Sequence, residues 1–471
     1  MKKIILKMLS LVAIVGFYSC DSELDIAPTD ILIEQEVFSD RATAESALAG
    51  VYNKLFRASV GSTYVIGDAS LPYVGLPENS SYANFFDGNL ISDNTTVGEI
   101  WRGYYEAINL ANVFIARIPE VGTYEETIER QHIAEAKFNR AYAYWALLSF
   151  YGSKALIGNP DGLGVPLQLN PYNGFNDSDL IPRSTNAEVY AQIVKDLTEA
   201  FEDLPLTHDT ALKTRARATK GTAQAMLSRV YLYNKKYELC VSASDEVLAN
   251  SNYELQSDLL DVFPPNEEGT TSSFSEETIF GFPVSGNNGN FQFGPHGIYF
   301  YNKNYWATSD FINSMDPNDK RRTELIFKGN PNITNPIRAK EMTTFKFNNN
   351  YQRDDIQVIR LAEIMLNKAE ALAQLNGVNA TSVDLLNDIK ERAGLDPVAV
   401  DDFGTKAELL DALYRERYVE TAFEGRARFD FIRTDRPLRV GTLTDDQKTF
   451  PIPLREIELA DGILVQNPGY N

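Results

Sequence analysis

Large apolar side chains recur at helical spacing over most of the chain. Trp101, Tyr105 and Ile108 follow one another at intervals of four and three residues, the period of an amphipathic helix. Pro119 comes after this run, and we expect it to end the helix. The same pattern predicts helices over residues 39–57, 99–118, 125–151, 186–203, 215–234, 236–249, 356–375, 380–393 and 405–424.

Two long stretches interrupt this pattern. Residues 58–96 are rich in Gly, Ser, Asn and Tyr, and residues 250–350 hold many Gly, Asn, Pro and aromatic residues. The tail after residue 425 also lacks helical periodicity. We therefore expect a helical scaffold over about 39–249 and 356–424, with an irregular lobe over about 250–350.

The predicted helices come in pairs that resemble one another. Residues 220–249 and 360–393 both place small residues between large ones on a first helix, followed by a short turn and a second helix. A unit of about 34 residues with this organisation is typical of tetratricopeptide repeats. The prediction is an all-α fold: a tetratricopeptide-like helix-pair scaffold with large irregular loop insertions and a few short strands.

The first twenty residues have the organisation of a secretory leader. Lys2, Lys3 and Lys7 precede an apolar run that ends shortly before Cys20. A cysteine at this position is the diacylglycerol acceptor of bacterial lipoproteins, and a plain leader with an incidental cysteine is the alternative. We expect residues 1–19 to be a signal peptide, 20–38 a lipidated tether and 39–471 a single domain.

Charge and cysteine content exclude several classes of partner and site. The chain has 44 Lys and Arg residues against 65 Asp and Glu residues, a formal net charge of -21. Nucleic acids and anionic headgroups require a basic surface, so neither is an expected partner. Two cysteines cannot build a disulfide framework or a Cys-pair zinc site, and Cys240 is expected to be an inert core thiol.

No motif for catalysis is present. His132, His208 and His296 are far apart, and the common phosphate-binding and hydrolase motifs are missing. The segment from Asp316 to Asp319 suggests a calcium loop but lacks the central glycine, so a turn or cap is preferred. We expect no enzyme activity, no cofactor and no metal; a glycosidase with an unrecognised carboxylate pair is a weaker alternative.

Aromatic residues crowd the irregular lobe. Residues 291–311 hold eight aromatics in 21 positions, interleaved with amide side chains. Sugar rings stack on flat aromatic faces, while polar groups bind their hydroxyls. Some of these rings must fill the lobe's own core, and Phe291, Phe293 and Phe311 are expected to do so, as Trp101 and Trp145 do in the scaffold. The candidates for ligand binding are Trp306, Tyr305 and Tyr301, with Asn304 on the rim.

Five segments of the chain resemble a known family. They are CDSELDIAPTD at 20–30, AEAKFNRAYAYWALLSFYG at 134–152, RLAEIMLNKAEALAQLNG at 360–377, RERYVETAFEGRARFDFIR at 415–433 and FPIPLREIELADGILVQNPGY at 450–470. In order and spacing they resemble the SusD/RagB family, surface lipoproteins of Bacteroidota that capture nutrients for a TonB-dependent outer-membrane transporter. The resemblance implies an all-α fold with four tetratricopeptide-like helix pairs and an irregular ligand-binding lobe.

The resemblance also implies a function and further candidates. Ligand sites of the family lie between the early loop and the later lobe, which adds Tyr73 and Tyr82. The implied partners are a SusC-like TonB-dependent transporter, a glycan, and the outer membrane through the lipid on Cys20. A transporter lid or assembly scaffold, or a peptide-binding relative, is the alternative to non-catalytic glycan binding and delivery.

One of these segments is dense in charges. Its residues Arg415, Glu416, Arg417, Glu420 and Glu424 could form ion pairs that hold the last helix on the scaffold. As isolated exposed pairs they would contribute about 0–1 kcal/mol each. Gly425 is the expected stop of that helix.

Overall fold

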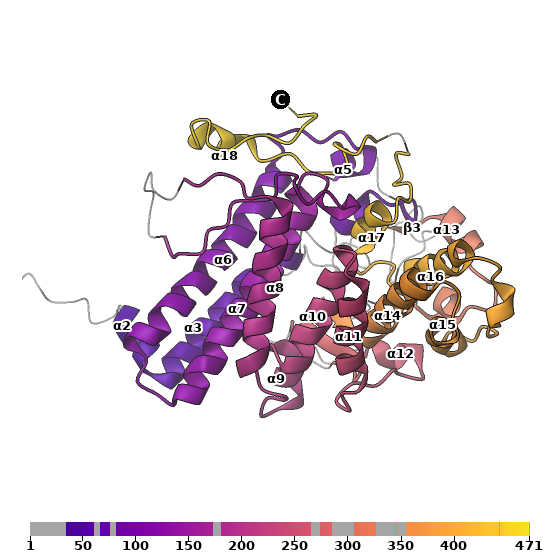
Figure 1. Cartoon of the computed structure of the whole chain (residues 1–471), viewed down its shortest axis with the longest axis horizontal. Helices are drawn as coiled ribbons and strands as arrows, with labels where there is room; N and C mark the ends of the chain where they lie inside the picture. Colours follow the sequence, from indigo (N-terminus) through magenta and orange to yellow (C-terminus); the bar gives the residue numbers. More distant parts are fainter. Residues whose placement is uncertain are drawn as a thin grey trace, which may run out of the picture.

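The computed structural model describes residues 34–60, 66–75, 82–172, 180–264, 274–284, 306–325, 344, 346, 355–441 and 443–470. Its long helices stand side by side in a row that follows the chain, from the indigo helices on the left to the orange helices on the right (Figure 1). The first part of the row comprises α2 (Glu34–Ser39), α3 (Arg41–Ser59), α6 (Thr95–Val121), α7 (Glu126–Tyr151) and α8 (Asn186–Asp203). The second comprises α10 (Lys220–Tyr233), α11 (Tyr237–Leu248), α14 (Leu361–Asn376), α15 (Ala380–Arg392) and α16 (Lys406–Glu420). The predicted helix-pair scaffold is confirmed.

Capping residues define where these helices begin. The side chain of Asp40 accepts hydrogen bonds from the amides of Ala42 and Thr43 at the start of α3. Thr185 and Glu188 form a capping box on α8, and Thr405 forms another with Glu408 on α16. These caps lie within one residue of the predicted helix starts, because the cap chemistry is local and readable in the sequence.

Several predicted boundaries are wrong. Helix α6 continues past Pro119 to Val121, and its last turn is closed by the amide of Gly122 donating to the carbonyl of Ile118 at 2.8 Å. Helix α2 occupies the end of the expected tether, where Phe38 packs edge-on against Phe114. The predicted helix 215–234 is split into α9 (Ala211–Ala216) and α10.

Two small antiparallel sheets are present in the described part of the chain. Strand β1 (Val74–Gly75) pairs with β3 (Trp306–Ala307), and β2 (Thr278–Phe282) pairs with β4 (Ile356–Arg360). The second sheet corrects the predicted helix 356–375, whose first five residues form β4 and whose helix begins at Leu361. β4 is buried along its whole length, so pairing with β2 satisfies backbone groups that a helix would have satisfied internally.

Short helical segments fill the connections. The tail expected to be irregular contains α17 and α18, which is a further correction. In Figure 1 the C-terminal segment with α18 lies above the upper end of α6, beside α5. These segments are α4 (Gly67–Ala69), α5 (Ala83–Asp87), α12 (Leu259–Val262), α13 (Ser309–Ser314), α17 (Ala427–Arg433) and α18 (Leu454–Leu459), with single turns at Ala155–Ile157, Arg321–Leu325 and Val400–Asp402.

The core lies between the helices, and α7 is buried on nearly all sides in its C-terminal half. Trp101, Trp145 and Phe311 are buried as expected, whereas Phe291 and Phe293 lie outside the described residues. Cys240 is fully buried, and burial raises the pKa of its thiol to about 12. The predicted place of this thiol in the core is therefore confirmed.

Candidate functional site

Trp306 lies on the surface of the irregular lobe, where strand β3 pairs with β1. Its partner across the ladder is Gly75. A Cβ atom at Gly75 would overlap the indole nitrogen of Trp306, so only glycine lets the ring lie against this strand. The tryptophan side chain is half-buried, which leaves part of the indole open to solvent.

Thr308, two residues after Trp306, anchors this segment to the early loop. Its amide donates to the carbonyl of Tyr73 at 2.9 Å, and its hydroxyl donates to the carbonyl of Pro72 at 3.1 Å. The same hydroxyl accepts from the amide of Phe311 and thereby caps α13. The segment that follows Trp306 is thus fixed to the early loop by hydrogen bonds to two of its backbone carbonyls.

Arg439 brings a cation and a second aromatic ring to the same strand. Its guanidinium donates to the carbonyl of Val74 at 3.0 Å and lies 3.5 Å from the ring centroid of Phe86. The residue remains exposed; burial of part of its guanidinium lowers the pKa, which the nearby Asp87 opposes. We call Gly75, Phe86, Trp306 and Arg439 the aromatic platform.

The aromatic platform has the chemistry that neutral sugars require. An indole face offers contact area to the C–H face of a pyranose at a low entropy cost. Guanidinium N–H groups donate hydrogen bonds to the hydroxyls of a sugar. The guanidinium of Arg439 stacks on the Phe86 ring, which fixes its position. No group of three His, Cys, Asp or Glu residues is placed to hold a metal among the residues described.

The structure separates the sequence-predicted site residues. Trp306 lies on the aromatic platform. Tyr82 is half-buried one helical turn before Phe86, but it lines a groove with Lys54 and Glu99. The remaining candidates, Cys20, Tyr301, Asn304 and Tyr305, lie outside the described residues.

The prediction that Tyr73 binds a ligand is wrong. Its side chain is fully buried, and its hydroxyl donates to Asp68 at 2.6 Å. The rings of Phe311, Tyr418 and Phe423 surround it with centroids about 5 Å away. It has no face open to a ligand, and it instead supports the strand on which Gly75 and Trp306 meet.

Sequence reasoning missed Phe86 and Arg439. Arg439 lies in a tail without periodic pattern, and its contact with Val74 joins residues 365 positions apart. Phe86 belongs to a five-residue helix in a loop that reads as irregular. The contacts of Arg439 with Val74 and Phe86 cannot be recognised from residue type or spacing, because they depend on how the C-terminal tail crosses the early loop.

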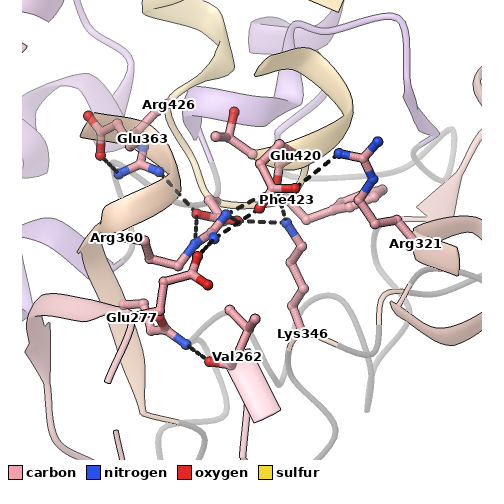
Figure 2. A network of polar contacts seen from close by, with 12 residues as sticks. Val262, Glu277, Arg321, Lys346, Arg360, Glu363, Glu420, Phe423 and Arg426 are labelled. Carbon is pink, nitrogen blue, oxygen red and sulfur yellow. Dashed lines mark hydrogen bonds and ion pairs between the residues drawn. The ribbon is translucent and has the colours of Figure 1, made fainter. Parts of the chain in front are cut away.

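Buried charged side chains form a network of polar contacts (Figure 2). Arg360 is at its centre and pairs with Glu277 at 2.5 Å, Glu420 at 3.0 Å and Glu424 at 2.7 Å. Arg392 bridges Glu277 and Glu420. Arg229 and Arg426 extend the network through Glu363.

The ion pairs predicted for this segment are formed, but most of them are buried rather than exposed. Glu416, Arg417, Glu420 and Glu424 are all buried, and only Arg415 keeps an exposed pair, with Asp411. Exposed charges on one helix would give weak contacts, whereas here strand β4 and α15 bring arginines onto the end of α16. The sequence shows charge density, but burial depends on these tertiary neighbours.

Two cations from the lobe join the network. Arg321 pairs with Asp319, with Glu416 at 2.5 Å and with Glu420 at 3.0 Å. Lys346 donates to the carbonyl of Glu420 at 2.7 Å and to the carboxylate of Glu424 at 2.6 Å. The preference for a turn over a calcium loop at Asp319 is thereby supported, since its carboxylate is already occupied by Arg321.

The turn after α16 connects this network to the aromatic platform. The amide of Gly425 donates to Asp68 at 3.1 Å, and the amide of Phe423 donates to the hydroxyl of Tyr73 at 3.3 Å. Phe423 has a φ of 66°, a left-handed conformation that is strained for a phenylalanine. The charges around Glu424 therefore hold a strained turn against the residues that support Gly75.

Three carboxylates of the network, those of Glu363, Glu420 and Glu424, are stabilised as anions. Burial alone would raise the pKa of Glu424, but Arg360, Lys346 and Arg426 outweigh it and lower the pKa to about 2. The pKa values of Glu420 and Glu363 are lowered in the same way, because arginines outweigh their burial. For Lys346 burial outweighs the attraction of Glu424, and its pKa is lowered.

Comparison with known proteins gives consistent matches. A family model described as "Starch-binding associating with outer membrane" matches residues 24–232, and the SusD family model matches residues 216–470. The SusD-like protein P38 of Formosa agariphila is 23% identical over 97% of this chain and 97% of the relative.

Solved structures share the fold. A SusD superfamily protein from Bacteroides fragilis superposes with a TM-score of 0.76 at 27% identity, covering 90% of this chain and 99% of that one. A SusD-like carbohydrate binding protein from Bacteroides vulgatus gives a TM-score of 0.71 at 22% identity, with 85% of each chain covered. The chain belongs to the SusD family, whose members are non-catalytic binding proteins.

Proposed function

We propose that this protein holds a glycan on the aromatic platform and delivers it, without chemistry, to a TonB-dependent transporter in the outer membrane. The observation that carries the proposal is the part-exposed indole of Trp306, held against Gly75 and accompanied by the Arg439–Phe86 pair. A relative described as carbohydrate binding and a family model described as starch-binding support the ligand class.

The membrane attachment belongs to the same proposal. Within the described residues, none of the helices has the length and apolarity needed to cross a bilayer. Cys20 would carry the lipid, and the residues before α2 would span from the lipid to the folded domain. The family model's description as associating with the outer membrane supports this placement.

Trp306→Ala should abolish glycan retention while leaving the fold intact, because it removes the part-exposed ring on which a sugar would stack. The measurement is affinity gel electrophoresis of residues 21–471 in a panel of neutral polysaccharides. Tyr231→Ala is the matched control, since Tyr231 is another half-buried aromatic but lies on α10. Retention that survives the Trp306 change, together with lower thermal stability, would favour the role of a lid without its own glycan site.

A second observation favours a protein partner. A cavity of about 430 Å³ opens between α6 and the C-terminal segment, with Tyr105, Leu180 and Ile181 among its walls. Beside it Leu459 is 50% and Val465 is 56% exposed. Apolar side chains grouped on a surface mark protein contacts more often than scattered ones do. We assign this surface to the transporter.

Leu459→Asp with Val465→Asp should weaken co-purification of the transporter by at least about tenfold, because two carboxylates would be desolvated in the contact. Glycan retention by the same variant should be unchanged. Leu206→Asp is the control, since Leu206 is 65% exposed in the connection after α8. Equal recovery of the transporter with both variants would remove this surface from the proposal.

A further inference from the structure

A second cavity lies away from strands β1 and β3, where the turn after α10 meets α14, α16 and α17. Its volume is about 360 Å³, and its walls include Tyr233, Tyr237, Glu370, Gln374, Tyr414 and Arg433. Small-molecule sites span about 300–1,000 Å³, so the volume suits one or two sugar rings. None of these residues belongs to the aromatic platform.

Unpartnered hydroxyl groups line this cavity. Tyr233 is 3% exposed, and its hydroxyl makes no hydrogen bond to the residues that the structure describes, but it is not one of their enclosed unpartnered polar atoms, so solvent reaches it. Its ring is held between Trp145 and the guanidinium of Arg433, which lies 5.0 Å from the ring centroid. The hydroxyl of half-buried Tyr237 likewise lacks a partner among the described residues. Both hydroxyls are therefore open to a ligand, and a molecule rich in hydroxyls would offer a hydrogen bond to each of them.

The polar walls are preorganised. Glu370 accepts from Arg433 at 2.5 and 2.8 Å and from Arg417 at 3.3 Å, so its carboxylate is occupied. Gln374 reaches the hydroxyl of Tyr414 at 3.4 Å, and the guanidinium of Arg436 covers the Tyr414 ring. The lining is therefore fixed before a ligand arrives.

The formal charges of the lining cancel. Lys235 and Arg433 supply two positive charges, and Glu370 and Asp435 supply two negative ones. An anionic or cationic ligand would gain little from such a site. A neutral ligand that offers hydroxyls to tyrosines and an apolar face to their rings fits this lining best.

We propose that this cavity is a second saccharide site, which binds one or two units of a neutral glycan; the inference rests on the glycan-binding function proposed above. Helix α16 runs from the cavity to the residues beneath the platform. Tyr414 of the cavity and Tyr418 lie one turn apart, and Tyr418 packs on Tyr73 and Phe311 beneath the platform. A long glycan that reached both sites would dissociate more slowly than one held at a single site.

Isothermal titration of residues 21–471 with maltohexaose, cellohexaose, xylohexaose and mannohexaose tests the proposal. One probe should bind with a stoichiometry of two. Tyr237→Ala should reduce the stoichiometry to one by removing the cavity site. Trp306→Ala should also reduce it to one, by removing the platform site. Tyr237→Phe keeps the packing and should weaken the second site about tenfold through the lost hydrogen bond. Tyr231→Ala is the control and should retain both sites.

Each outcome decides between the two proposals. A stoichiometry of one that Trp306→Ala abolishes and Tyr237→Ala leaves intact would overturn the second site and keep the platform. Binding that depends on Tyr237 but not on Trp306 would support the cavity and overturn the platform. No heat with any probe at millimolar concentration would overturn both.

Discussion

Glu420→Gln should lower the free energy of unfolding by about 3–5 kcal/mol. The carboxylate of Glu420 is 4% exposed and accepts from Arg321, Arg360 and Arg392. Glutamine keeps the shape but removes the charge and places an amide donor among guanidinium donors. The three buried guanidinium groups would then each lose one carboxylate partner. Leaving a buried charge without its partner lowers stability far more than losing an exposed ion pair does. Urea unfolding of residues 21–471 measures the effect.

Two further variants keep this prediction testable. Glu458→Gln is the matched control, because Glu458 is exposed on α18, and it should change stability by less than about 0.5 kcal/mol. Glu416 touches Arg321 alone among the cations of the network, so Glu416→Gln should cost less than Glu420→Gln and still allow folding. Equal costs for all three glutamates would show that burial in the network has no energetic weight.

The helical scaffold could be predicted from the sequence because its signals are local. The capping box at Thr185 and Glu188 and the apolar period of α6 both act within a few residues. Strand β4 was missed for the opposite reason. Its pairing with β2 joins residues about eighty positions apart, and the adjoining helix α14 extends the apolar pattern without a break.

The candidate site was predicted only where composition carries information. Trp306 stood out because aromatics are concentrated in a stretch that no helix requires. Tyr73 belongs to a loop that also contains Tyr64 and Tyr82, yet its ring is enclosed by α13, α16 and the turn at Phe423. Which ring of a loop is enclosed depends on the tertiary neighbours. The same dependence hid Arg439, whose partners are a backbone carbonyl and a ring in the early loop.

The stability of the protein should fall steeply below pH 4.5. The folded-state pKa of Glu424 is about 2 against an ordinary value of 4.5, and those of Glu363 and Glu420 are also lowered. A lowered carboxyl pKa stabilises the fold fully above the unfolded value, and this stability is lost as the pH falls towards the folded value. Between its folded and unfolded pKa values each such group contributes a slope of at most about 1.4 kcal/mol per pH unit, and the contributions of the three groups add.

Urea unfolding at pH 6, 5, 4 and 3.5 measures this slope. Glu424→Gln should reduce the slope by about 1.4 kcal/mol per pH unit, because one proton fewer is taken up on unfolding. Glu458→Gln should leave it unchanged. A carboxyl titration of the native protein by carbon NMR supplies a measurement that does not depend on any variant folding, and a Glu424 carboxyl that titrates near pH 4.5 would contradict the prediction.

The same protonation should reach the ligand site. Glu424 binds Lys346 and holds the turn whose Phe423 and Gly425 contact Tyr73 and Asp68 under the platform. Neither Trp306 nor Arg439 gains or loses a proton between pH 5 and 3, but Asp87 lies beside Arg439, so Asp87→Asn is the control for a carboxyl at the platform. Glycan retention that declines together with stability over this range would therefore place the cause in the buried charges that support the platform. Retention that declines above pH 5, where stability is still constant, would require a different titrating group.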